Sequence, residues 1–182
     1  MNQHYFVGIS VPKQQTISLT KATHQMELKK THKIVVASED MHITLMYLGA
    51  VNPHQMNDLT NYMESVSKCH NPFEIHSTSV RVFGNEEMPR VVYAKIEEKQ
   101  ELHSLQKDLS IGANETGLLL DKKPFVPHIT LAKKWSGFVQ MQPIISFNDP
   151  IQFTVEKFSL FEIRPNQSPK YKPIATFQLG DR

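Results

Sequence analysis

Short apolar runs and longer amphipathic segments follow one another along the chain. Runs rich in β-branched and aromatic residues, bounded by Pro, Gly or polar residues, predict strands. Apolar residues that recur every three or four positions predict helices. We expect strands at 4–11, 33–37, 42–49, 72–84, 90–97, 125–135, 151–165 and 171–180. We expect helices at 13–30, at about 52–69, where Asn52-Pro53 supplies an N-cap and a first helical residue, and near 99–110. This succession predicts a mixed α+β fold.

The tetrapeptide His-Ile-Thr-Leu occurs twice, at 42–45 and at 128–131. A second copy would arise by chance with odds of roughly one in a few hundred, so the repeat indicates an internal duplication. Each copy lies in a predicted strand, one in each half of the chain. We therefore expect a single domain over residues 1–182, built from two related lobes with one His-x-Thr-x motif in each.

Side chains of a strand alternate between its two faces. His42 and Thr44 should therefore share one face of their strand, and His128 and Thr130 one face of theirs, with the Ile and Leu of each motif on the opposite, apolar face. If the lobes pack about a pseudo-twofold axis, the polar faces meet across a cleft. Two imidazoles and two hydroxyls would then surround one small volume.

Two imidazoles across a cleft suit acid–base chemistry on a phosphodiester. Histidine titrates near neutral pH, so one ring can accept a proton from water while the other donates one to the departing oxygen. The hydroxyls of Thr44 and Thr130 can donate hydrogen bonds to the non-bridging oxygens. This scheme requires no metal ion and no cofactor. A single strand of this kind is more often a half-solvated edge, and the repeat is what favours a site.

Composition and charge narrow the class of protein only a little. The chain has 40% hydrophobic residues, enough for a core, and its net charge of +2 permits a nucleic-acid partner without demanding one. Cys69 is the single cysteine, so no intramolecular disulfide can form. Neither a signal-peptide pattern nor a membrane-spanning run is present, and H-E-x-x-H and C-x-x-C zinc patterns are absent. We expect a cytoplasmic protein, not bound to a membrane, and a monomer.

Several segments resemble the 2H phosphoesterases, and in particular the RNA 2′,3′-cyclic phosphodiesterase (2′-5′ RNA ligase-like) family. They are YFVGISVP, DMHITLMYLGAV, PFEIHSTSVRVFG, PFVPHITLAKKW and the closing FSLFEIRPNQSPKYKPIATFQL with Tyr171. The resemblance covers nearly the whole chain. It implies a bilobal α+β fold with two antiparallel sheets lining a central cleft and helices on the outside.

The resemblance also implies an activity, the hydrolysis of a terminal 2′,3′-cyclic phosphate of RNA to a 2′-phosphomonoester. His42 matches the first motif histidine and would donate a proton to the leaving 3′ oxygen. His128 matches the second and would accept a proton from water. Thr44 and Thr130 would hold the phosphate oxygens. A pseudo-symmetric site can exchange the two histidine roles if the substrate enters reversed.

Two positions that the resemblance assigns to substrate binding depart from the family's pattern. Lys133 stands where the family often has Arg, and lysine keeps the charge but lacks the bidentate fork. Tyr47 follows the first motif where the family has Phe. Nearby, Lys122-Lys123 and Lys133-Lys134 could attract an RNA backbone, and Phe83 and Trp135 could stack on a base.

Three other functions remain open from the sequence. The same site could act on small cyclic nucleotide phosphates or on 2′-5′-linked oligonucleotides. A protein of a different class, a non-catalytic module that binds RNA ends, could keep the fold without needing both histidines. Both histidines and both threonines are intact, which argues against such a module. The expected partner is RNA with a 2′,3′-cyclic phosphate end, or a related cyclic nucleotide.

Overall fold

The computed structural model describes residues 3–137 and 140–180. The helices are α1 (Lys13–Gln25), α2 (Leu28–Thr31), α3 (Pro53–Cys69) and α4 (Gln100–Glu115), with a 3₁₀ turn η1 (Ser38–Asp40). The strands are β1 (His4–Ser10), β2 (His32–Val35), β3 (His42–Ala50), β4 (Phe73–Gly84), β5 (Pro89–Lys95), β6 (His128–Trp135), β7 (Ser146–Val155), β8 (Lys157–Ile163) and β9 (Tyr171–Gln178). No helix in these ranges is long and apolar enough to cross a membrane.

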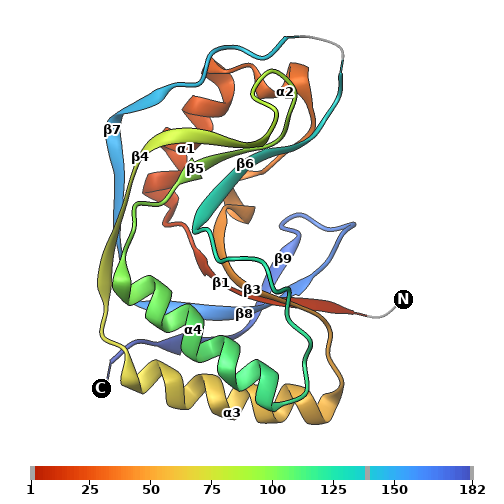
Figure 1. The fold of residues 1–182 in the computed structure, drawn as a ribbon, viewed down its shortest axis with the longest axis vertical. Helices are drawn as coiled ribbons and strands as arrows, with labels where there is room; N and C mark the ends of the chain where they lie inside the picture. Colours follow the sequence, from red (N-terminus) through yellow and green to blue (C-terminus); the bar gives the residue numbers. More distant parts are fainter. Residues whose placement is uncertain (1–2, 138–139, 181–182) are drawn as a thin grey trace.

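The strands form two antiparallel halves that meet at β3 and β6. Their order is β7-β4-β5-β6-β3-β1-β8-β9, with β2 paired to β6. One registered pair, Ile43 with Ile129, joins the halves. Helices α1 and α2 lie with the upper half in Figure 1, and α3 and α4 cover the lower half. One cluster of buried apolar side chains includes residues from both halves, which supports our proposal that residues 1–182 form a single two-lobed domain.

The start of α3 confirms the helix predicted from Asn52-Pro53. The Asn52 side chain accepts a hydrogen bond from the backbone N–H of Gln55 (2.9 Å), and the Gln55 side chain accepts one from the backbone N–H of Asn52 (3.2 Å). This reciprocal capping box satisfies two backbone donors that the helix itself leaves unpaired. Pro53 occupies the first turn, where its missing N–H costs nothing.

Two predicted elements are each divided in the structure. The helix expected over 13–30 is interrupted, because Glu27 adopts a left-handed backbone (φ 50°) between α1 and α2. The single strand expected over 151–165 is two strands that separate at Glu156. Strand β7 pairs with β4 in one lobe and β8 pairs with β1 in the other, so the chain crosses between lobes at this point. Figure 1 shows this crossing along the left edge of the molecule.

Candidate active site

The two repeated motifs meet where β3 lies beside β6. Ile43 and Ile129 are directly paired in an antiparallel register, and both are fully buried. Directly paired residues point to the same face, and their neighbours along each strand point to the other. The histidine and threonine of both motifs therefore share the face opposite the core. Continuing the same register places each histidine across from the threonine of the other motif.

A β-bulge follows the threonine in each motif. In β3 the register against β1 steps over Leu45, and in β6 the register against β5 steps over Leu131. An extra residue shifts the alternation of side chains by one position. The next side chain on the face of the histidines is therefore three residues after the threonine, which is Tyr47 in β3 and Lys133 in β6. Strict alternation would have placed both on the apolar face.

A pocket of about 230 Å³ opens on this face. It is lined by His42, Thr44, Tyr47, Thr130 and Lys133, together with Phe6, Val36, Ile163 and Tyr171. His128 lines a neighbouring hollow of about 260 Å³ that shares Thr44 and Tyr47 with the first. The structure thus brings five of the six expected site residues into one pocket and sets the sixth at its border.

The His42 ring is held at both nitrogens. Its Nδ1 lies 2.7 Å from the carbonyl oxygen of Asp40, and because a carbonyl only accepts, Nδ1 carries the proton. In the neutral ring, Nε2 then accepts a hydrogen bond from the hydroxyl of Thr44 (3.0 Å). The rings of Phe6 and Tyr171 pack against the imidazole, with centroids 4.7 and 4.9 Å away. In this tautomer the nitrogen that faces the pocket, Nε2, carries no proton.

Burial is the main reason that the pKa of His42 falls to about 4. The hydrogen bond to the Asp40 carbonyl opposes this shift, and the positive charges of Lys133 and His128 add to it. In the free protein His42 is therefore neutral at physiological pH.

His128 repeats the arrangement of His42 in the other lobe. Its Nδ1 donates to the carbonyl oxygen of Val126, again at 2.7 Å and again two residues earlier. The rings of Phe83 and Tyr93 lie edge-on to the imidazole, with centroids 5.1 and 5.2 Å away. Burial lowers the pKa of His128, and the Val126 carbonyl opposes that shift. Both imidazoles thus present Nε2 as the reactive nitrogen.

The positions of two other aromatic candidates can also be read from the structure. Phe83 stacks on Tyr93, with centroids 4.1 Å apart, beside the His128 ring. Trp135 packs edge-on against His32, which is buried. Trp135 therefore covers the edge of a core, and it does not line the pocket.

Asp40 is a site residue that the sequence reasoning missed. It is only 6% exposed, and its Oδ1 accepts hydrogen bonds from the backbone N–H groups of Lys170 (2.8 Å) and Tyr171 (3.2 Å). Burial and this carboxylate together raise the pKa of Tyr171. Asp40 thus holds His42 through its carbonyl and the start of β9 through its side chain. Its place two residues before the motif histidine was the available signal.

Phe6 was missed as well, since its strand reads as a core strand. In the part of the chain that the structure describes, no group of three or more His, Cys, Asp or Glu side chains is placed to hold a metal ion. The site's polar groups are imidazoles, hydroxyls and an ammonium, which suit an anionic ligand.

Comparison with known proteins places this geometry in a family. The family model of the 2′-5′ RNA ligase superfamily matches residues 18–167, which include both motifs. The chain belongs to this superfamily. Among superfamily relatives, the RNA 2′,3′-cyclic phosphodiesterase of Bacillus subtilis (strain 168) is 32% identical over 97% of both chains. A protein of the same name from Geobacillus stearothermophilus is 30% identical over 97% of this chain, which spans 57% of that relative.

Solved structures show the same fold. The crystal structure of E. coli LigT complexed with 3′-AMP matches with a TM-score of 0.85 at 20% identity, over 100% of both chains. The crystal structure of a Thermus thermophilus protein, TT0787, matches with a TM-score of 0.82 at 25% identity, over 98% of this chain and 100% of that chain. These likenesses confirm the bilobal α+β fold expected from the motifs.

Proposed function

We propose that the protein hydrolyses the terminal 2′,3′-cyclic phosphate of RNA to a 2′-phosphomonoester. The observation that carries the proposal is the placement of two identical His-x-Thr motifs on one face where β3 meets β6. The names of the curated relatives support the choice of substrate. The pocket's aromatic walls and its ammonium group are compatible with a nucleotide that carries a phosphate.

In this proposal His128 is the general base. Its Nδ1 proton is committed to the Val126 carbonyl, so Nε2 is free to take a proton from water. The water oxygen forms a bond to phosphorus as the bond from phosphorus to the 3′ oxygen breaks. The depressed pKa of His128 keeps the ring neutral, which is the state that a base requires.

His42 is the general acid and protonates the departing 3′ oxygen. Because burial keeps its ring neutral in the free protein, it must gain a proton as the substrate binds. A phosphate anion beside the imidazole favours the charged form and raises its pKa. Protonation of Nε2 also ends its hydrogen bond from Thr44, and the Thr44 hydroxyl then becomes available to a phosphate oxygen. The donor is thus charged only when the anion is present.

The remaining polar groups of the pocket bind the anion. The hydroxyls of Thr44 and Thr130 donate to the non-bridging oxygens, and the half-buried ammonium of Lys133 adds a positive charge. Tyr47 lies at the entrance, half exposed, with its hydroxyl 2.7 Å from Nδ1 of His4. Side chains carry both proton transfers and the positive charge that faces the phosphate, so the scheme requires no metal ion.

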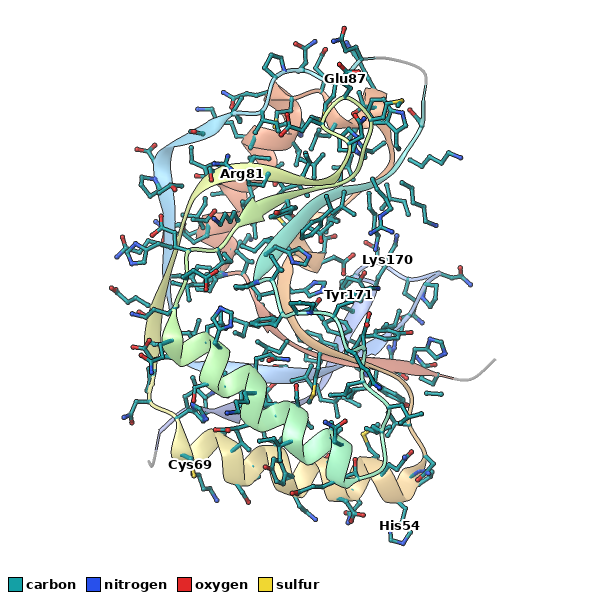
Figure 2. The ribbon with its side chains drawn as sticks, in the orientation of Figure 1. His54, Cys69, Arg81, Glu87, Lys170 and Tyr171 are labelled. Atoms are coloured by element: carbon teal, nitrogen blue, oxygen red, sulfur yellow. The ribbon has the colours of Figure 1, made fainter. Side chains whose placement is uncertain are left out.

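The test is product identification on a short RNA that ends in a 2′,3′-cyclic phosphate, incubated with the protein in EDTA. We expect a 2′-phosphate product, and a loss of at least about 10²-fold in rate for both His42→Ala and His128→Ala. His54→Ala is the matched control, because His54 lies exposed at the outer end of α3 (Figure 2). Absence of turnover by the wild type would overturn the proposed substrate, and small cyclic phosphates and 2′-5′ linkages would then be assayed.

A further inference from the structure

Three lysines gather at one side of the pocket. Lys133 lines the pocket itself, Lys134 follows it at the end of β6, and Lys170 directly precedes Tyr171, which lines the same pocket. Figure 2 shows Lys170 and Tyr171 where the hairpin of β8 and β9 reaches between the two lobes. Residues from opposite lobes thus bring positive charge to one rim.

The backbone of Lys170 is fixed at this rim from both sides. Its N–H donates to the buried carboxylate of Asp40 (2.8 Å), and its carbonyl accepts from the N–H of Arg164 (2.7 Å). The Asp40 carboxylate also accepts a hydrogen bond from the N–H of Tyr171, so it binds the loop backbone and not the Lys170 ammonium. The Lys170 side chain is exposed and projects from an anchored residue.

The backbone of Lys134 adopts an unusual conformation. Its φ of 64° is left-handed, which few residues other than glycine adopt. In a regular strand Lys134 would point away from Lys133, and the left-handed turn breaks that alternation. Holding a non-glycine residue in this conformation costs of order 1 kcal/mol of folding free energy. Residues with such backbone strain cluster at functional sites.

The Lys133 ammonium lies close enough to Lys134 and Lys170 to be affected by their charges. Burial lowers the pKa of Lys133 most, and the charges of Lys170 and Lys134 lower it further. Within residues 3–137 and 140–180, none of the three forms an ion pair with a carboxylate. Gathered ammonium groups that form no ion pair favour an anionic ligand.

We infer that Lys134 and Lys170, with Lys133 between them and the histidines, form a second phosphate subsite for the phosphate on the 5′ oxygen of the terminal nucleotide. In an RNA strand this phosphate links the terminal nucleotide to the one before it. The apolar and aromatic walls formed by Phe6, Val36, Ile163 and Tyr171 lie in the same pocket as Lys133 and can take the nucleoside between the two phosphates. The inference rests on the proposed function and deepens it, because such a subsite selects oligonucleotides over mononucleotide cyclic phosphates.

The test compares three substrates that end in a 2′,3′-cyclic phosphate: a mononucleotide with a free 5′ hydroxyl, a dinucleotide, and the same dinucleotide with a neutral methylphosphonate link. For the wild type we expect kcat/KM to be about tenfold higher for the charged than for the neutral dinucleotide, as one charge-assisted contact of about 1.4 kcal/mol would give. In the double variant Lys134→Gln/Lys170→Gln this ratio should fall toward one.

A double variant of remote lysines, Lys29→Gln/Lys107→Gln, removes the same net charge from exposed positions on α2 and α4. It should keep the wild-type ratio, which separates a local subsite from general electrostatic attraction. Equal kcat/KM values for the charged and neutral dinucleotides in the wild type would overturn the subsite and leave the proposed function standing. A wild type that turns over none of the three would overturn both.

Discussion

Leu45 and Leu131 are the extra residues of two β-bulges that occupy the same place in the two repeated motifs. Each follows the threonine directly, and each brings the residue three positions after that threonine to the face of the histidines. The repeated unit is therefore a bulged strand with three side chains on one face: the histidine, the threonine and the residue three positions after the threonine. The lobes differ at the third, with Tyr47 in one and Lys133 in the other, and this difference makes one side of the site positive.

The depressed pKa values of both histidines predict an acidic optimum for kcat/KM. The active form requires one protonated and one neutral ring, and kcat/KM reports the pKa values of the free protein. These are about 4 for His42 and a value below 6.5 for His128, so both limbs of the profile should lie below pH 6.5. We expect kcat/KM to fall by about tenfold from pH 7 to pH 8.

The profile of kcat should lie at higher pH than that of kcat/KM, because bound phosphate raises the pKa of both rings. Steady-state kinetics on one substrate across pH 4 to 9 measures both profiles. A kcat/KM that stays constant from pH 6.5 to pH 8 would contradict the assignment of these histidines as the titrating pair.

The partly buried, neutral ring of His42 should make folding sensitive to acid. Its pKa is lowered from 6.5 to about 4 in the folded protein, so below pH 6.5 the unfolded chain binds the proton more readily. This contribution to stability is complete above pH 6.5 and is lost as the pH falls through about 4. It amounts to about 3 kcal/mol between pH 7 and pH 4.

Urea unfolding at the two pH values measures this effect. The loss of unfolding free energy on acidification should be about 2–3 kcal/mol smaller in His42→Asn than in the wild type. His54→Asn, at an exposed position of α3, should keep the wild-type loss. An equal loss in all three proteins would mean that His42 is not buried in its neutral form.

Close contact between β1 and β3 beside the first motif makes Gly8 sensitive to substitution. A Cβ at this position would lie 2.7 Å from the carbonyl oxygen of Ile43, so the strands would have to separate. We expect Gly8→Ala to lower the unfolding free energy by about 1–3 kcal/mol, as overpacking does. Denaturant midpoints measure this, and Ser10→Ala, on the exposed end of the same strand, should change stability by less than about 0.5 kcal/mol. Matching midpoints for the two variants would show that the strands tolerate the extra carbon.

The sequence predicted the shared face of the two motifs, because alternation in a strand depends only on local geometry. It also predicted the start of α3, where Asn52 and Pro53 act on neighbouring backbone groups. The bulges at Leu45 and Leu131 were not predicted, since a buried leucine fits the regular pattern as well as a bulged one. The tether from Asp40 to Tyr171 joins residues far apart in the chain, and no local pattern encodes it.

The break between β7 and β8 at Glu156 was likewise not predicted, because no local pattern encodes it. Apolar and β-branched residues continue across it without Gly or Pro, so the sequence reads as one strand, whereas the partners β4 and β1 lie in different lobes. Tertiary pairing decides where such a run divides.

The division of labour between His42 and His128 is tested most directly by changing the leaving group. A p-nitrophenyl phosphodiester releases a group that needs no proton, so it bypasses the general acid and still requires the general base. On RNA with a 2′,3′-cyclic phosphate end, we expect both His42→Ala and His128→Ala to be inactive. On the aryl diester, His42→Ala should keep activity within about tenfold of the wild type, whereas His128→Ala should lose at least about 10²-fold. Full RNA turnover by either variant, or equal losses on the aryl diester, would contradict the acid–base pair assigned to these two residues.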